Sequence, residues 1–335
     1  MNLHQDFLLV YSMSKPNTSQ HLKSVLRWIV RVLIFQLILI NISAAFHAYR
    51  FTHYYDDEKT RNLPPSHGTI FLRTWRLMTG KKLARSRIES YPQMPYDTVQ
   101  LTIGNKNKIN GWLIKTDSSI GTVILFHGLA SNKAAVLSEA YEFLSMHYNT
   151  LLIDLRAHGS SEGIVSSLGV KESEEVKSAF DYIKGTGEKN IILWGISLGS
   201  VIITKAIDDY GIEPQKVILE MPFNKLQDHL KARARVLGFP EEPFGFLITL
   251  WSGIEQGYWG FGHNTSKYVK KIKCPVLLQW GVMDSYVLQK ETETIFSSIG
   301  SKEKYLVIYQ NAGHESFLNY ESAKWIASVK NFLGK

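Results

Sequence analysis

The chain has 335 residues, a formal net charge of +8 and a single cysteine, Cys274. One cysteine excludes an intramolecular disulfide, and no spacing of cysteine and histidine indicates a metal site. The basic residues are scattered and form no stripe with interleaved aromatic residues, so the charge gives little support to nucleic-acid binding.

An apolar segment at residues 25–48 is the first element in chain order. As a helix, the stretch from Trp28 to Tyr49 would be about 31 Å long, close to the roughly 30 Å of a bilayer's hydrocarbon. Aromatic residues at both ends suit the two membrane interfaces. Basic residues outnumber acidic ones before the segment only, so the positive-inside rule places residues 1–24 in the cytosol and the large domain on the non-cytosolic side.

Two other interpretations of this segment stay open. Small residues at 43–45 resemble a cleavage site, so a signal peptide could be removed and the protein exported. A buried core helix is the third interpretation. The long stretch before the apolar run is unusual for a signal peptide, and we therefore expect an uncleaved transmembrane anchor. Residues 49–95 are predicted to form a connector with a short amphipathic helix at 70–78.

Strand and helix patterns alternate over residues 96–335. Two strands form a hairpin, and the later ones are short runs of Val, Ile and Leu. This alternation predicts an α/β fold with a mostly parallel, eight-stranded sheet covered by helices on both faces. The expected strands are 98–103, 109–115, 121–126, 149–154, 190–194, 216–220, 275–280 and 304–309, and the expected helices lie near 132–147, 170–184, 198–210, 287–298 and 317–333.

One interval, at about 222–271, breaks this rhythm and is rich in aromatic residues. We expect an inserted helical lid over the carboxyl ends of the strands, where open α/β sheets bind ligands. The alternative is an enlarged crossover packed on the domain.

Ser197 lies at the centre of a G-x-S-x-G motif at residues 195–199, between a predicted strand and a predicted helix. In that context a serine on a sharp turn presents its hydroxyl, and the flanking glycines allow close approach of the backbone. Ser197 is therefore the candidate nucleophile. The alternative is an ordinary turn serine.

A serine nucleophile needs a base and a carboxylate that orients the base. His314 follows the last predicted strand and is the candidate base, whereas His229 and His263 fall in the lid and are expected to be surface or packing residues. Asp284 follows the strand 275–280 and is the candidate carboxylate, with Glu220 as its rival. The chain order Ser, Asp, His is the one expected on this scaffold.

The oxyanion of an acyl-transfer intermediate needs fixed donors. We expect one from the backbone amide of Leu198, which follows the nucleophile, and one from that of Leu129 in the loop after strand 121–126. No metal or organic cofactor is required.

These motifs together resemble the α/β-hydrolase superfamily over about residues 96–335, and within it the membrane-anchored hydrolases of the serine-aminopeptidase-like and ABHD/Bem46-type groups. The resemblance implies the same roles for Ser197, Asp284 and His314. The chain lacks the triple-glycine oxyanion loop of one lipase and esterase branch. The stretches that carry the resemblance are residues 126–128, 154–159, 195–199, 274–281 and 312–314.

We expect a serine hydrolase that cleaves an ester or related acyl bond through an acyl-serine intermediate. The apolar lid and the anchor favour a small-molecule acyl substrate that is hydrophobic, such as a lipid or lysolipid. One alternative is an aminopeptidase, in which Glu241, Glu242 and Glu255 would hold the α-amine. A catalytically silent binding protein on the same scaffold is a further alternative.

Overall fold

The computed structural model describes residues 18–61, 69–104, 107–236 and 238–334. Residues 1–17 of the predicted cytosolic segment therefore lie outside the described residues, and so do residues 62–68 of the predicted connector. The chain divides into two compact units, Met1–Ile42 and Ser43–Lys335.

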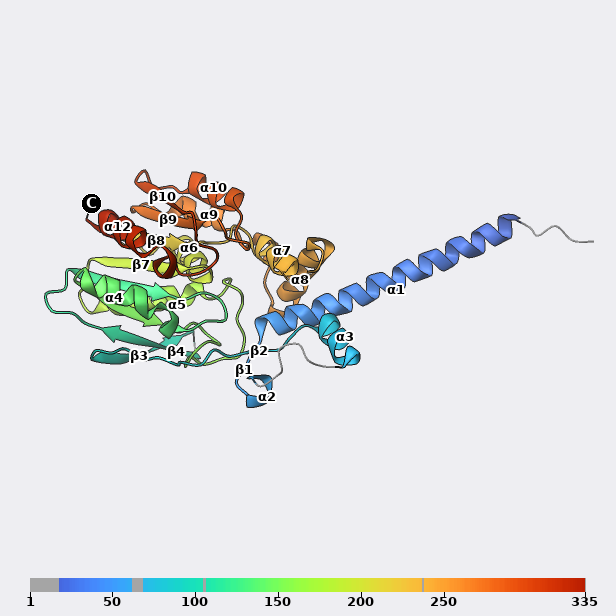
Figure 1. Ribbon diagram of the computed structural model, residues 1–335, viewed down its shortest axis with the longest axis horizontal. Coiled ribbons are helices and arrows are strands. Elements are labelled where there is room, and N and C mark those ends of the chain that lie inside the picture. Colours follow the sequence, from blue (N-terminus) through green and yellow to red (C-terminus); the bar gives the residue numbers. More distant parts are fainter. Residues whose placement is uncertain (1–17, 62–68, 105–106, 237, 335) are drawn as a thin grey trace, which may run out of the picture. The chain divides into compact units, whose positions relative to one another are not determined.

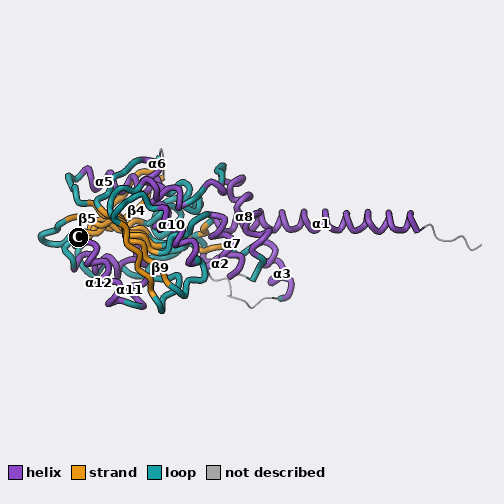
Figure 2. Tube along the Cα trace, turned by 90° about the horizontal axis from the view of Figure 1, so that it is seen from above, coloured by secondary structure: helices purple, strands orange, loops and turns teal. Residues whose placement is uncertain are grey.

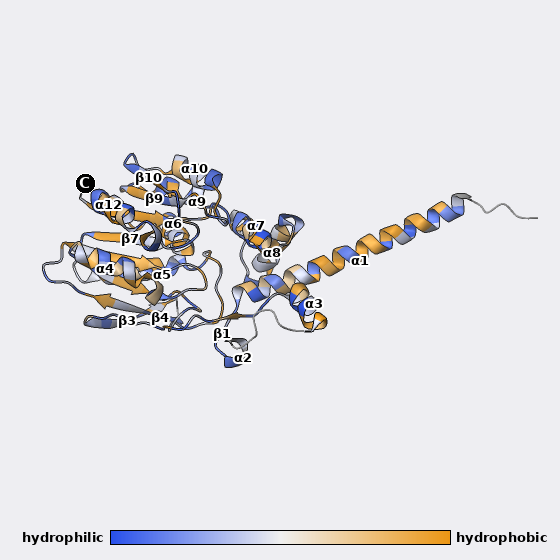
Figure 3. Cartoon of the chain, in the orientation of Figure 1, coloured by the Kyte–Doolittle hydropathy of each residue, from blue (hydrophilic) through white to orange (hydrophobic). Residues whose placement is uncertain are grey.

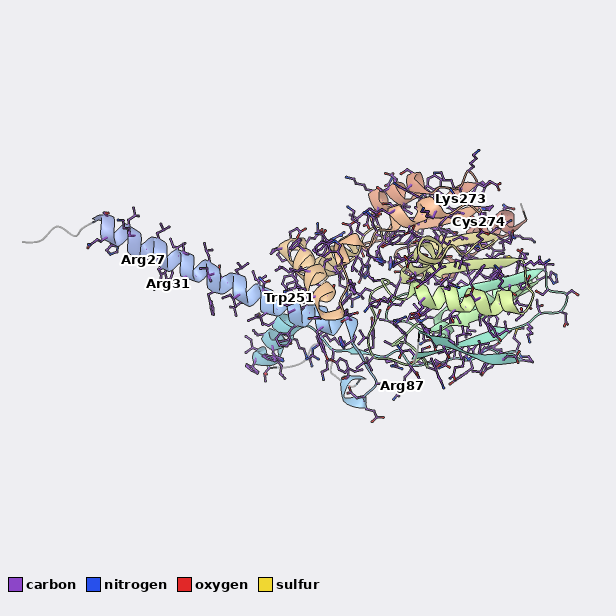
Figure 4. The ribbon with its side chains drawn as sticks, turned by 180° about the vertical axis from the view of Figure 1, so that it is seen from behind. Arg27, Arg31, Arg87, Trp251, Lys273 and Cys274 are labelled. Atoms are coloured by element: carbon purple, nitrogen blue, oxygen red, sulfur yellow. The ribbon has the colours of Figure 1, made fainter. Side chains whose placement is uncertain are left out.

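The first unit consists, where it is described, of most of helix α1 (Thr18–Thr52). The span Ser19–Thr52 contains a window with a mean hydropathy of 2.2, of which only 11% is buried. The apolar colouring of this helix is visible in Figure 3, and Arg27 and Arg31 are labelled on its N-terminal half in Figure 4. A helix of this length and composition can cross a membrane or act as a signal sequence. Its exposure argues against a core helix.

The second unit contains an eight-stranded sheet with the order β10-β9-β8-β7-β5-β6-β4-β3 (Figure 1). The strands from β10 to β6 are parallel, and the hairpin of β3 and β4 adds two antiparallel strands at one edge. The strands are β3 (Tyr96–Ile103), β4 (Asn107–Ile114), β5 (Gly121–Phe126), β6 (Tyr148–Ile153), β7 (Ile191–Ile196), β8 (Lys216–Glu220), β9 (Val276–Gly281) and β10 (Lys304–Tyr309).

Helices cover both faces of the sheet, as Figure 2 shows for α5 and α6 on one side and α11 and α12 on the other. Apolar side chains from the strands and helices form one buried cluster on each face. The expected α/β architecture is therefore confirmed. The helices of this layer are α4 (Leu137–Ser145, preceded by the 3₁₀ turn Lys133–Val136), α5 (Ser173–Gly185), α6 (Leu198–Tyr210), α10 (Gln289–Ser298), α11 (Phe317–Tyr320) and α12 (Ser322–Leu333).

The interval predicted as a lid is helical. It contains α7 (Leu226–Val236), α8 (Glu241–Gln256) and α9 (Thr265–Tyr268), with 3₁₀ turns at Gly260–Gly262 and Val269–Lys271. Trp251, labelled in Figure 4, belongs to α8. The helices α7 and α8 pack against each other.

The last turns of α1 belong to the second unit (Ser43–Lys335), which is called the hydrolase unit below. The sequence did not indicate this. Ala44, Ala48 and Thr52 are completely buried there. Ser43 Oγ donates a hydrogen bond of 2.7 Å to the Met78 carbonyl in α3 (Ile70–Thr79). The region predicted as a connector also contributes α2 (Glu58–Arg61) and a two-stranded parallel sheet of β1 (Tyr54–Tyr55) and β2 (Leu83–Ala84).

Candidate active site

Ser197 forms the turn between β7 and α6. Its backbone angles, φ 53° and ψ −114°, lie in a region that side chains disfavour. The turn is possible because the flanking residues are glycines. A Cβ at position 195 would lie 2.5 Å from the carbonyl carbon of Gly199, and one at position 199 would lie 2.1 Å from the Phe126 oxygen. The hydroxyl is thereby held at the carboxyl edge of the sheet.

A chain of hydrogen bonds joins the three residues predicted as nucleophile, base and carboxylate. Ser197 Oγ lies 2.8 Å from His314 Nε2, and His314 Nδ1 lies 2.7 Å from Asp284 Oδ2. The other carboxylate oxygen, Asp284 Oδ1, accepts hydrogen bonds from the backbone amides of Tyr286 (2.7 Å) and Val287 (2.9 Å). With the carboxylate fixed in this way, Nδ1 of the imidazole carries the proton and Nε2 is free to accept one from the serine.

The rival carboxylate, Glu220, has different neighbours. Its Oε1 accepts hydrogen bonds from the indoles of Trp194 (3.0 Å) and Trp325 (2.6 Å) and from Gln279 (3.2 Å). Burial raises the pKa of Glu220 to about 8, with Glu139 adding to the shift. Glu220 is therefore part of the buried polar contacts on the α12 face and does not orient His314.

The two amides expected to bind an oxyanion lie on either side of this serine. Leu198 is the first residue of α6, and first-turn amides of a helix have no intrahelical acceptor. Leu129 lies in the loop after β5 and lines the same pocket as Ser197. Within the described parts of the chain, neither amide donates a hydrogen bond to a protein acceptor. Both are available to a bound oxyanion.

His127, a residue that could be mistaken for a base, holds the start of this loop. It is completely buried, and its Nε2 accepts a 3.1 Å hydrogen bond from the Leu155 amide. Its Nδ1 lies 2.7 Å from the Gly128 carbonyl. Burial lowers the pKa of His127. The ring is therefore neutral and has a structural role.

His158 holds the other side of the same loop. Its Nε2 accepts a 3.0 Å hydrogen bond from the Ala130 amide, and its Nδ1 lies 2.7 Å from the Arg156 carbonyl. Ala130 has a positive φ of 59°, so this contact fixes a strained residue directly after Leu129. Burial lowers the pKa of His158 to about 3, with the neighbouring His127 ring adding to the shift.

A cavity of about 460 Å³ opens at Ser197 and His314. The lid contributes two residues of α7 to its wall, His229 and Arg233. His229 is buried and stacks on Phe223 at a ring distance of 4.7 Å, and burial lowers its pKa to about 3. Of the two roles expected for it, surface or packing, it has the packing role, and its neutral ring also forms part of the pocket wall.

Arg233 is the residue of this cavity that sequence reasoning missed. It is mostly buried, and its guanidinium carbon lies 4.1 Å from the centre of the Phe51 ring. Burial lowers its pKa. In the described chain it forms no ion pair. In α7, basic residues alternate with alanines, and this pattern does not distinguish Arg233 from its neighbours Lys231 and Arg235. The sequence therefore gave no signal for this position.

The three lid carboxylates considered for binding an α-amine do not line this cavity. Glu241 pairs with Arg235 and Glu242 pairs with Lys231. Glu255 lines a different pocket, beside Lys171.

The carboxyl that does line the cavity is Glu139. It is buried, accepts a hydrogen bond from Ser316, and has a pKa raised by burial. The described residues contain no group of three or more His, Cys, Asp or Glu side chains that could hold a metal ion.

Comparisons with known proteins agree with this architecture. The family described as serine aminopeptidase, S33, matches residues 117–242. The uncharacterized protein YqkD of Bacillus subtilis is 24% identical over 249 residues, which cover 73% of this chain and 81% of YqkD. The lysophosphatidylserine lipase ABHD12 of Danio rerio is 26% identical over 236 residues, covering 66% of this chain and 60% of ABHD12.

Solved structures share the fold. The Pyrococcus furiosus esterase Pf2001 superimposes with a TM-score of 0.62 at 23% identity, covering 75% of this chain and 97% of the esterase. The Exiguobacterium antarcticum esterase EaEST gives a TM-score of 0.55 at 18% identity, covering 70% and 99% of the two chains.

The fold and these matches define the class that the protein resembles: the chain has the α/β-hydrolase fold. Its sequence is similar to proteins of the ABHD and serine-aminopeptidase-like kind. The matches therefore support a hydrolase.

Proposed function

We propose that this protein is a serine hydrolase that cleaves a carboxylic ester or a related acyl bond. Ser197 is the nucleophile, His314 the general base and Asp284 the carboxylate that orients the base. The observation that carries the proposal is the unbroken chain of hydrogen bonds from Ser197 Oγ through the His314 ring to Asp284. The strained turn at Ser197 supports it independently.

In the first half of the reaction, Ser197 Oγ attacks the acyl carbon while His314 Nε2 takes the hydroxyl proton. The carbonyl oxygen becomes an oxyanion, to which the amides of Leu129 and Leu198 donate hydrogen bonds. The bond to the leaving alcohol then breaks, and the alcohol takes the proton from His314. The product is an acyl-Ser197 ester.

In the second half, a water molecule gives a proton to His314 Nε2 and its oxygen attacks the acyl carbon. The same two amides stabilise the second oxyanion. The acid then leaves, and Ser197 regains its proton from His314. Asp284 stays ionised throughout and stabilises the imidazolium that forms in each half.

An ester fits the pocket better than a peptide with a free α-amine. The pocket wall carries Arg233, whose positive charge repels an ammonium group, and the pKa of its one carboxyl, Glu139, is raised by burial, which disfavours the anion that an ammonium needs. The lid carboxylates Glu241 and Glu242 pair with other residues. The lipase activity in the name of ABHD12 favours a hydrophobic acyl substrate, such as a lysolipid.

The test is a substrate panel with the purified full-length chain in detergent. We expect kcat/KM for a short p-nitrophenyl ester to exceed that for an aminoacyl-anilide by at least roughly a hundredfold, because the aryl ester has the better leaving group and the anilide also places an ammonium group near Arg233. An acyl thioester of equal chain length serves as the matched third substrate. Faster cleavage of the anilide would make the protein an aminopeptidase, and no cleavage of any substrate would favour a silent binding protein.

We further propose that α1 is retained as a single-pass anchor, with residues 1–24 in the cytosol and the hydrolase unit on the other side. The burial of Ala44 and the hydrogen bond from Ser43 to Met78 favour retention, because cleavage near residue 45 would remove both contacts. Activity should stay with carbonate-washed membranes, and an N-terminal epitope should resist protease added to intact cells. A mature chain that starts after residue 45 would contradict the proposal.

A further inference from the structure

A second cavity, of about 720 Å³, lies within the hydrolase unit and is lined by basic side chains from three separate regions. It has no aspartate or glutamate among its described lining residues. Clustered cations repel one another, and such a cluster without carboxylates is typical of an anion site. The basic lining residues are Arg50 from the end of α1, Arg73 and Arg76 from α3, Lys81, and Arg233 from α7.

Two of these arginines have no carboxylate partner among the described residues, although the Arg50 side chain is hydrogen-bonded to Tyr55. Arg50 Nε and Nη1 are buried and lack a hydrogen-bond partner among the described residues. Arg233 stacks on Phe51 and, in the same part of the chain, pairs with no carboxylate. Guanidinium N–H donors that no carboxylate occupies match the oxygens of a phosphate group.

Arg233 also lines the pocket that contains Ser197. Arg233 therefore forms part of the wall of both cavities, so an anionic group bound in the basic cavity would lie on the other side of this residue from the serine pocket. The basic cavity also has an apolar part, formed by Phe51, Leu77 and Phe239. This combination suits an amphiphile that carries a phosphate.

The helix that supplies two of the cations is amphipathic. In α3, Phe71 is 72% exposed and Trp75 is 54% exposed. A short helix with exposed aromatic residues and arginines is typical of a segment that lies in a membrane interface. Arg50 follows the apolar run of α1 directly in sequence, which is where a membrane-spanning helix meets the headgroups.

We propose that this basic cavity binds the phosphate of an anionic lipid substrate while its acyl ester lies at Ser197. The proposal rests on the ester hydrolase activity proposed above and adds the headgroup class. Arg50 and Arg73 are the positioning residues for the phosphate, and Arg233 separates it from the reacting ester. The chemistry recognised is a phosphate monoanion or dianion, and we assign it to the lipid headgroup.

The experiment compares three lipids with the same acyl chain in mixed micelles with the full-length protein: lysophosphatidylglycerol, lysophosphatidylcholine and monoacylglycerol. In the wild type we expect kcat/KM for lysophosphatidylglycerol to exceed that for monoacylglycerol by roughly tenfold to a hundredfold, with lysophosphatidylcholine between them. The double variant Arg50→Gln/Arg73→Gln should lose most of this ratio, chiefly through KM for the anionic lipid.

Arg87→Gln is the matched control, because it removes the same charge from an exposed arginine that does not line the cavity. Arg87 is labelled in Figure 4. It should keep the wild-type ratio. If the double variant does not fold, Arg73→Gln alone decides the matter, since Arg73 is exposed. Inorganic phosphate is the remaining arm, and it should raise KM for lysophosphatidylglycerol without changing monoacylglycerol hydrolysis.

Three results would overturn the proposal: equal rates on all three lipids in the wild type, an unchanged ratio in the arginine variants, or a response of monoacylglycerol hydrolysis to inorganic phosphate. The last would assign the cavity to free phosphate. In each case hydrolysis of the neutral lipid would leave the proposed ester hydrolase intact, whereas failure to cleave any ester would reject that function itself.

Discussion

Replacing Ser197 with alanine should lower kcat for a short p-nitrophenyl ester by roughly four to six orders of magnitude. The variant loses the atom that forms the acyl intermediate, while the amides of Leu129 and Leu198 still bind the carbonyl oxygen and leave a small residual rate. The alanine retains the fold, because the side chain contacts solvent-accessible His314 rather than the core. Ester hydrolysis and labelling with a fluorophosphonate probe measure the loss.

The other members of the chain of hydrogen bonds should behave as parts of one unit. Asp284→Asn should cost roughly 10⁴ in kcat, because an amide cannot hold the His314 tautomer that accepts the serine proton. Adding His314→Ala to Ser197→Ala should lower the rate no further. Ser285→Ala is the matched control: it removes an exposed hydroxyl beside Asp284 and should keep full activity. Normal labelling of the Ser197→Ala protein would refute the assignment.

The largest effect on stability is expected at Asp154. Its carboxylate is completely buried, forms an ion pair with buried Lys133, and accepts hydrogen bonds from the backbone amides of Lys133 (2.7 Å) and Ser160 (2.8 Å). Asp154→Ala leaves the lysine charge buried without its partner, so we expect the free energy of unfolding to fall by about 3–5 kcal/mol. Urea unfolding in detergent measures it.

An exposed ion pair supplies the control for this experiment. Asp97 pairs with Lys115 at 2.8 Å, but the two side chains are 64% and 65% exposed. Asp97→Ala should therefore leave the free energy of unfolding nearly unchanged. Adding Lys133→Met to Asp154→Ala should restore part of the lost stability, because the unpaired charge is removed. Equal losses in Asp154→Ala and Asp97→Ala would show that burial of the pair has no energetic consequence.

The core of the fold was predictable because its strands are short apolar runs that only a sheet covered on both faces can bury. The expected strand at 190–194 extends to Ile196 in the structure, immediately before Ser197. The expected helix at 317–333 is divided into α11 and α12, since Glu321 has non-helical angles of φ −128° and ψ 55°. The two-residue strands β1 and β2 carried no periodic signal and were not predicted.

The candidate site was likewise predictable only in part. Ser197, Asp284 and His314 each follow a recognisable strand, so the position of the strand ends predicts that they meet. The positions of Arg233 and His229 depend on how α7 packs against the last turns of α1, where Phe51 contacts both residues. Such a contact between segments far apart in sequence has no local pattern, and it could not be read from the chain.

The loop that contains Leu129 depends on two imidazole rings that accept backbone hydrogen bonds only while they lack a second proton. Burial lowers the pKa of His158 to about 3, whereas an imidazole in the unfolded chain titrates near 6.5. Between those two values the unfolded chain binds a proton that the folded chain excludes, so stability present at neutral pH is lost as the pH falls. Protons thus bind preferentially to the unfolded form, so a fall in pH destabilises the loop that carries the Leu129 amide expected to bind the oxyanion.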